Sequence, residues 1–244
     1  MSPVQPLHIQ RHVLASVDST NTRAKAMAAE GAPAGTLITA AEQTAGRGRH
    51  GNSWQSMTGN LFASVILRPD ISASDVGQLS FLIAVALAET LAGILPKDTH
   101  MGLKWPNDVL INDRKCAGIL LESEASGSGK LPWVVAGLGV NLAVAPEGAI
   151  SLPQAGADML SPQEFLERFE PVLVGWYDRW QAEGFAPVQA AWSMHAINRG
   201  KEIRVRLTRE ELSGVFEGID NNGALQLRLS DSSLRLISSG EVYL

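Results

Sequence analysis

The sequence contains one cysteine and few histidines, and both shortages exclude whole classes of site. Cys116 is the single cysteine of the 244 residues, which excludes an intrachain disulfide. The five histidines are scattered along the chain, and no cysteines or histidines have the spacing of a zinc site. Cys116 stands in an apolar strand-like run without a positioned base, which indicates a small core residue. We therefore assign no metal ligands and no cysteine nucleophile, and a reducing cytoplasm fits the chain.

Excess positive charge and long uninterrupted apolar runs are also missing. The formal net charge is −5, which disfavours a general nucleic-acid partner and an anionic membrane surface. The N-terminus has no basic region followed by an apolar one, so we expect no signal peptide. The apolar residues between 76 and 94 recur at helical spacing, but Ser80 and Glu89 interrupt them, so they predict a core helix. We expect a cytoplasmic protein without DNA or membrane partners, in which any anion site is local.

The chain divides into two parts that differ in their predicted secondary structure. Its apolar content of 45% and charged content of 18% are ordinary for a soluble protein. Buried strand-like runs alternate with helical patterns in residues 1–197, and residues 101–122 read as two strands. From residue 198 short alternating strands follow one another. The pattern predicts an α+β fold: a mixed β-sheet flanked by helices in residues 1–197, and a small all-β module in residues 198–244.

Residues 40–54 are the segment richest in glycine, arginine and hydrogen-bonding side chains. The string from Gly46 to Gly51 is a literal G-x-G-x-x-G, but a dinucleotide-binding motif requires a helix after it. The strand-like run 61–67 follows instead. We predict a flexible loop in which Arg47, Arg49 and unobstructed glycine N–H groups hold an anion. From this string alone, a solvated turn with two arginines is the alternative.

Other polar residues stand at the ends of predicted elements. Ser19, Thr20 and Asn21 open a helix, either as a redundant cap or as hydrogen-bonding groups that face a ligand. Lys115 begins an otherwise apolar strand, so its ammonium either extends to solvent or meets an anionic or carbonyl partner. Asp108 follows a proline at a strand break, where side chains point into clefts or form ordinary turns.

Glycines interrupt a second buried strand. Gly137 and Gly139 stand two residues apart in this run. A glycine inside a strand marks a close approach by another backbone or by a ligand. The pattern therefore adds a second surface to the candidate site.

Five strings, in this order, resemble the biotin protein ligase family. They are Ser19-Thr-Asn21, Glu42-Gln-Thr-Ala-Gly-Arg-Gly-Arg49 with Trp54, Lys104-Trp-Pro-Asn-Asp108, Arg114-Lys-Cys-Ala-Gly-Ile-Leu-Leu-Glu122 and Gly137-Leu-Gly-Val-Asn141. The C-terminal strings Gly218-Ile-Asp220 and Gly223-Ala-Leu225 resemble the family's SH3-like domain. The resemblance implies a class II synthetase-like catalytic domain followed by a small SH3-like β-barrel. It also implies that biotin and ATP form biotinyl-5′-AMP and pyrophosphate, before a carrier-protein lysine attacks the adenylate.

The resemblance implies a role for each matched residue. Lys115 polarises the biotin carboxylate and then the mixed-anhydride carbonyl, Arg49 closes over the phosphate, and Asp108 orients Mg²⁺ or the incoming lysine. Polar residues hold the ureido end of biotin, the arginine loop covers its tail, and the glycines line the biotin and adenylate pockets. The implied binding residues are Ser19, Thr20, Asn21, Gln43, Arg47, Gly48, Arg49, Trp54, Lys115, Gly118, Gly137, Gly139 and Asn141.

The same resemblance implies the reactants and partners. ATP and biotin are the substrates, Mg²⁺ is expected, and the acceptor is the biotin carboxyl carrier protein of acetyl-CoA carboxylase or of another biotin-dependent carboxylase. We expect a monomer or a homodimer. Some family members carry an N-terminal DNA-binding domain and act as repressors, but so few residues precede the match that we expect this domain to be missing. Asn52 and Met57 depart from the family's usual basic residue and proline, which concerns loop closure.

Two other functions remain open. Lipoate ligases and octanoyltransferases use the same catalytic scaffold, and the paired arginines with Lys115 favour biotin over these substrates. A non-catalytic biotin-binding module is the second alternative. Arg49 and Lys115 argue against it, because a protein that only binds the biotin ring needs no positive charges at the carboxylate end.

Overall fold

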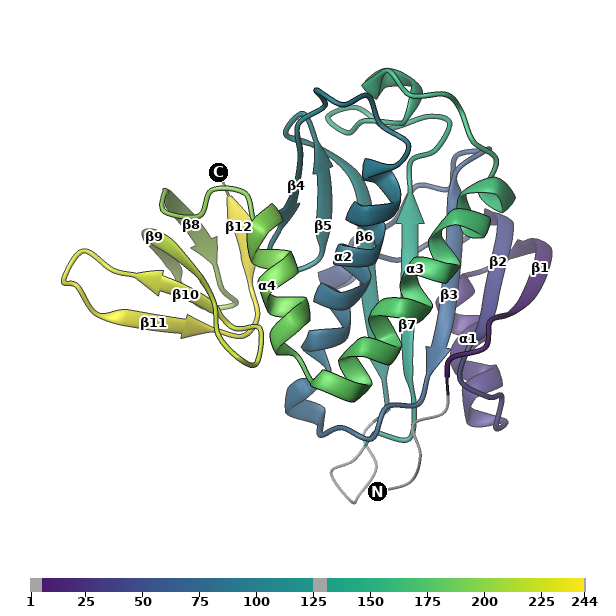
Figure 1. Cartoon of the computed structure of the whole chain (residues 1–244), viewed down its shortest axis with the longest axis horizontal. Helices are drawn as coiled ribbons and strands as arrows, with labels where there is room; N and C mark the ends of the chain where they lie inside the picture. The colour runs from purple at the N-terminus through teal and green to yellow at the C-terminus, as the bar shows by residue number, and fades with distance from the viewer. Residues whose placement is uncertain (1–5, 125–130, 244) are drawn as a thin grey trace.

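The computed structural model describes residues 6–124 and 131–243 (Figure 1). The glycines and serines of residues 123–130 predict a turn, and most of that segment lies outside the described residues. The helices in order are α1 (Thr20–Ala29), α2 (Gly77–Ala92), α3 (Pro162–Glu183) and α4 (Ala186–His195). The strands of the first sheet are β1 (Gln10–Val17), β2 (Thr36–Gln43), β3 (Leu61–Leu67), β4 (Met101–Lys104), β5 (Asp108–Ile111), β6 (Arg114–Ser123) and β7 (Val134–Val140). The strands of the second are β8 (Glu202–Arg206), β9 (Glu211–Ile219), β10 (Leu225–Arg228), β11 (Leu234–Ile237) and β12 (Glu241–Tyr243).

The first sheet is mixed, as predicted. Its strand order is β1-β2-β3-β7-β6-β5-β4, in which β1 and β2 are parallel and the other neighbours are antiparallel. Successive residues of a strand point to opposite sides of the sheet, so each face has its own buried side chains. Helices cover both faces. Leu37 and Val65 belong to the large core under α2, whereas Ile38 and Ile66 pack against Ala24 of α1. The α+β fold with a helix-flanked sheet is therefore confirmed.

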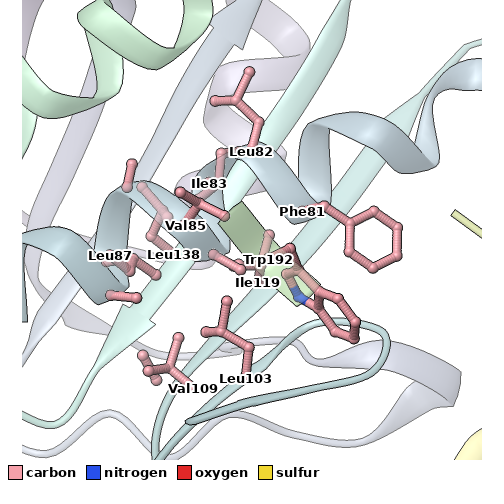
Figure 2. Packing of buried hydrophobic residues seen from close by; sticks show 14 of the residues in the cluster. Phe81, Leu82, Ile83, Val85, Leu87, Leu103, Val109, Ile119, Leu138 and Trp192 are labelled. Atoms are coloured by element: carbon pink, nitrogen blue, oxygen red, sulfur yellow. The ribbon is translucent and has the colours of Figure 1, made fainter. Parts of the chain in front are cut away.

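The C-terminal sheet is antiparallel, with the strand order β11-β10-β9-β8-β12, and lies beside α4 (Figure 1). It continues the core of the first sheet. Phe81 of α2 meets Trp192 of α4 edge to face at 5.2 Å between ring centroids, and Trp192 meets Phe216 of β9 at 6.4 Å. Figure 2 shows Phe81 and Trp192 side by side at one end of this packing. The two sheets thus share buried aromatic contacts, which fixes residues of β12 near the first sheet.

The structure corrects one prediction, the number of strands in residues 101–122, and supports another, that α2 is a core helix. Residues 101–122 form three strands and not the predicted two, because the chain reverses around Pro106 and brings Asp108 opposite Lys104. The segment Ala73–Ala92 is long and apolar enough to cross a membrane, but 67% of that stretch is buried inside the protein. It is the predicted core helix.

Candidate functional site

A polar cavity lies on the face of the first sheet that α1 covers. It is bounded by the N-terminal end of α1, the loop after β2, the middle of β6 and β7, the β4–β5 turn and the start of β12. Every predicted site residue except Asn141 lines it: Ser19, Thr20, Asn21, Gln43, Arg47, Gly48, Arg49, Trp54, Asp108, Lys115, Gly118, Gly137 and Gly139. Segments distant in sequence therefore converge on one cavity.

Asn141 is the residue that the structure does not bring into the cavity. Its side chain is buried and donates to the backbone carbonyls of Lys115 and Ile150, both at 3.3 Å. Its backbone N–H donates to the carbonyl of Cys116 at 2.9 Å. Asn141 thus holds the start of β6 in place, and it acts on the cavity through the strand that carries Lys115.

The loop between β2 and β3 folds back on itself. The N–H of Gly48 donates to the carbonyl of Asn52 at 2.7 Å, and the N–H of Trp54 donates to the carbonyl of Gly46 at 3.0 Å. His50 has a left-handed φ of 54°, which lets the chain reverse at the tip of the loop. A strand follows the loop, as predicted, so the glycine string does not open a dinucleotide-binding helix.

The two arginines of the loop point to different partners. Arg47 donates to the Glu122 carboxylate at 3.0 Å and to the Thr22 hydroxyl at 3.1 Å. Arg49 donates to the Asn107 side-chain oxygen at 3.2 Å, and it pairs with no carboxylate in residues 6–124 or 131–243. Burial lowers the pKa of Arg49, although nearby carboxylates oppose this, and an arginine remains charged at neutral pH. A half-buried cation without an ion pair favours an anionic ligand.

The ammonium of Lys115 has an anionic partner, which is one of the two possibilities that the sequence left open. Its Nζ lies 2.6 Å from Oδ1 of Asp108 and 5.4 Å from the centroid of the Trp54 ring. Asp108 and Lys115 belong to neighbouring strands, and the β5–β6 hairpin brings them together. The Lys115 side chain is 38% exposed, so its ammonium also reaches the cavity. A carboxylate ligand would compete with Asp108 for this ammonium.

The glycines of the sheet are approached by side chains. A Cβ on Gly139 would lie 2.3 Å from the Trp54 ring, and a Cβ on Gly137 would lie 2.2 Å from Oδ1 of Asn21. A Cβ on Gly118 would lie 3.0 Å from the Trp54 ring and 3.0 Å from Cε of Lys115. The sequence led us to expect another backbone or a ligand there. The absence of side chains at these positions lets Trp54 and Asn21 lie directly on the sheet.

Glu122 and Ser64 contribute to the site although sequence reasoning gave them no role. Glu122 accepts from Lys25 at 2.6 Å and from Asn21 at 2.9 Å, in addition to Arg47. Burial by itself would raise the pKa of Glu122, but the hydrogen bonds and charges of these neighbours outweigh it and lower the pKa. A carboxylate at the end of an apolar strand was the signal for Glu122. No sequence signal marked Ser64.

The cavity offers few ligands for a metal ion. No group of three or more His, Cys, Asp or Glu side chains that could hold a metal occurs in the described residues. Asp108 and Glu241, the latter from β12, are carboxylates that line the cavity. This donor set fits a magnesium ion that takes its other ligands from phosphates and water.

Comparisons with known proteins agree with this arrangement. Residues 13–141 match the Biotin/lipoate A/B protein ligase family, and residues 200–244 match the Biotin protein ligase C terminal domain. The chain is 39% identical to the biotin--[acetyl-CoA-carboxylase] ligase of Paracoccus denitrificans, over 95% of this chain and 99% of that protein. It is 34% identical to the bifunctional ligase/repressor BirA of Bacillus subtilis, over 91% of this chain and 70% of that protein. The Aquifex aeolicus biotin protein ligase, solved in complex with biotin and ATP, has a TM-score of 0.79 and 26% identity, over 96% of this chain and 97% of that one.

Proposed function

Since the chain belongs to the biotin/lipoate A/B protein ligase family and is a biotin protein ligase that acts on biotin with ATP, we propose that it activates biotin in the cavity described above. The observation that carries this assignment is the contrast between the two ends of the cavity. One end holds neutral hydrogen-bonding groups around Thr20 and Gln43, and the other holds the charged groups Lys115 and Arg49. Biotin has the same division, with a neutral cyclic urea at one end and a carboxylate at the other.

The neutral end of the cavity is assigned to the ureido ring. Ser19, Thr20 and Asn21 are buried at the start of α1, and Gln43 from β2 accepts from the backbone N–H of Thr20 at 2.9 Å. These groups are supported by neighbouring strands, so little side-chain freedom is lost when a ring binds. Gly118, Gly137 and Gly139 form the floor, and Trp54 covers part of it.

The charged end is assigned to the reacting groups. Adenylation brings the biotin carboxylate close to the phosphates of ATP, so repulsion between anions is the main obstacle that the protein must offset. A carboxylate oxygen attacks the α-phosphorus and pyrophosphate leaves. Lys115 turns from Asp108 to the biotin carboxylate, and Arg49 and Arg47 cover the tail and the phosphate together with the Gly48 backbone. No enzyme nucleophile is required, and positioning supplies much of the rate.

The transfer step uses the same cavity. The acceptor lysine must arrive as a neutral amine and attack the mixed-anhydride carbonyl, with AMP as the leaving group and one proton released from the nitrogen as the amide forms. Asp108 is placed to orient this lysine or the magnesium ion that accompanies ATP, because its carboxylate lines the cavity beside Lys115. The relative from Paracoccus denitrificans is named for acetyl-CoA carboxylase. We therefore propose the biotin carboxyl carrier protein of that enzyme, or of another biotin-dependent carboxylase, as the acceptor.

The remaining assignments concern organisation and location. We propose a catalytic domain in residues 1–197 and an SH3-like domain in residues 198–244, a division that the separate matches to residues 13–141 and 200–244 support. We also propose that the protein works in the cytoplasm as a monomer or homodimer. The net charge of −5 disfavours DNA as a partner.

Pyrophosphate release tests the proposal directly. ATP and magnesium are held constant, and biotin, lipoate or octanoate is the only variable. We expect release with biotin at least about 10²-fold faster than with the other acids, because a site built to hydrogen-bond a substrate N–H or O–H rejects analogues that lack it. Equal or faster release with lipoate or octanoate would reassign the chain within its family.

A further inference from the structure

The turn between β4 and β5 is held by three different parts of the molecule. Trp105 donates its indole N–H to the carbonyl of Gly223 in the C-terminal module at 3.0 Å. The carbonyl of Pro106 accepts from the Ser80 hydroxyl of α2 at 3.2 Å. The Asn107 side chain donates to a carbonyl of β6 at 2.8 Å, and its backbone carbonyl accepts from an N–H of that strand at 3.0 Å. The bond from Trp105 therefore joins this turn to the C-terminal module.

The same turn leads to the partners of both cations at the charged end of the cavity. The side-chain oxygen of Asn107 accepts from the Arg49 guanidinium at 3.2 Å. Asp108, the next residue, lies 2.6 Å from the Lys115 ammonium. A charge lowers the barrier most when it is already in position as the transition state forms. A displacement of this turn would therefore move both cations relative to the reacting carboxylate and phosphate.

The C-terminal module presents the Gly223 carbonyl from a tight turn. Gly223 has a left-handed φ of 83°, and a Cβ there would lie 2.3 Å from the Phe81 ring of α2, so the position requires glycine. The Asp220 carboxylate accepts from the backbone N–H groups of Asn222 and Ala224, both at 2.8 Å. These two bonds fix the turn that carries the Gly223 carbonyl.

We infer that Trp105 is a positioning residue, which makes the arrangement of Arg49 and Lys115 depend on the C-terminal module. Trp105 borders the cavity and is 4% exposed, but its indole N–H bonds to Gly223, which lies outside the cavity lining. The inference rests on the proposed use of Arg49 and Lys115 at the charged end. Loss of this hydrogen bond should weaken adenylation and closure of the loop, and it should leave binding of the ring intact.

The variant Trp105→Phe tests the inference, because it keeps an aromatic ring and removes the N–H. We expect kcat for pyrophosphate release with biotin and ATP to fall about 10-fold, as for the loss of one hydrogen bond to a buried acceptor. Biotinylation of unrelated lysines, counted per adenylate formed, should rise because Arg49 is held less firmly. Unfolded protein forms no adenylate, so a loss of folded protein cannot produce this rise. The Kd of biotinol, in which an alcohol replaces the carboxylate, should stay within about twofold, because it reports on the neutral end.

Trp180→Phe is the matched control. Trp180 is 5% exposed and donates its indole N–H to the Gln78 side chain, also at 3.0 Å, but it does not line the cavity. The control should lose a similar amount of stability in urea unfolding, and its kcat should stay within about twofold of the wild type. Equal changes in kcat for the two variants would overturn the inference. A folded Trp105→Phe protein with unchanged pyrophosphate release and unchanged biotinylation of unrelated lysines would also overturn it.

A second variant acts from the module and covers the case in which Trp105→Phe fails to fold. Asp220→Ala removes the carboxylate that fixes the Gly223 turn, and we expect a smaller fall in kcat, about threefold, because the backbone bond from Asp220 to Ala224 remains. Asp220→Asn should restore kcat, because an asparagine oxygen can accept the same two bonds. Asp231→Ala is the control, since Asp231 fixes a different turn of the module by accepting from Ser233 at 2.9 Å.

An unchanged kcat in Asp220→Ala, or an equal fall in Asp231→Ala, would contradict the role given to Trp105. Failure of the proposed function is a separate result, because it would show as wild-type release that is no faster with biotin than with lipoate.

Discussion

Lys115 provides the sharpest test of the charged end of the cavity, and Lys115→Met is the informative change. Methionine keeps much of the side-chain volume and removes the ammonium, whose Nζ lies 2.6 Å from Asp108. A half-exposed ion pair contributes about 1 kcal/mol or less to stability, so the fold should survive. A charge about 4 Å from the reacting carboxylate interacts by about 4 kcal/mol at an effective dielectric constant of about 20. Removal of one donor to a developing charge costs about 10²- to 10³-fold. We therefore expect pyrophosphate release to fall by about 10²-fold or more.

The loss has two physical sources that a double variant separates. Lys115→Met also leaves the Asp108 carboxylate unpaired beside an incoming anion, which by itself would hinder biotin. In the double variant Lys115→Met with Asp108→Asn, this extra charge is gone. We expect release to stay low in the double variant, because the missing ammonium is the main cause. Lys97→Met, at an exposed lysine outside the cavity lining, is the control. A loss below about 10-fold in the single variant, or recovery in the double variant, would refute the role given to Lys115.

Three further predictions concern the loop, Glu122 and Cys116. Arg49→Gly should still form biotinyl-AMP but release it, so that lysines of unrelated proteins are biotinylated. Trypsin should cut the wild-type loop at Arg47 or Arg49 more slowly when biotin and ATP are present, and equal cleavage rates would mean that the ligands do not order the loop. The pKa of Glu122 is lowered from 4.5, so its contribution to stability is present above that pH and is lost as pH falls through the folded-state pKa. The difference in the free energy of unfolding by urea between the wild type and Glu122→Gln should therefore shrink below about pH 4.5, and an increase in that difference would contradict the prediction. Burial raises the pKa of Cys116 to about 12, so iodoacetamide at pH 8 should label it only after denaturation, and rapid labelling of the native protein would show an accessible thiolate.

Local sequence patterns predicted most of the architecture, and they failed where partners come from distant segments. Alternation and helical periodicity place the strands and helices, since each reflects which side of one element is buried. The same patterns could not show that Lys115 meets Asp108, because the pairing depends on the register between β5 and β6, which shifts between Val109 and Leu110. Nor could they show that Asn141 supports the backbone of Lys115 from below the cavity. The sequence strings that resemble the family identify which residues line the cavity, whereas the register between strands determines which side chains contact one another.

The residues found only in the structure connect recognition of the ring with the position of the loop. Glu122 accepts from the side-chain amide of Asn21 at 2.9 Å, and the same carboxylate oxygen accepts from Arg47 at 3.0 Å. The loop that carries Arg47 also carries Trp54, which lies over Gly139 on the floor of the cavity. A change that moves Glu122 therefore alters both the hydrogen-bonding pattern offered to the ring and an anchor of the loop. Because the two effects share one carboxylate, variants of Glu122 should affect ring recognition and retention of the adenylate together.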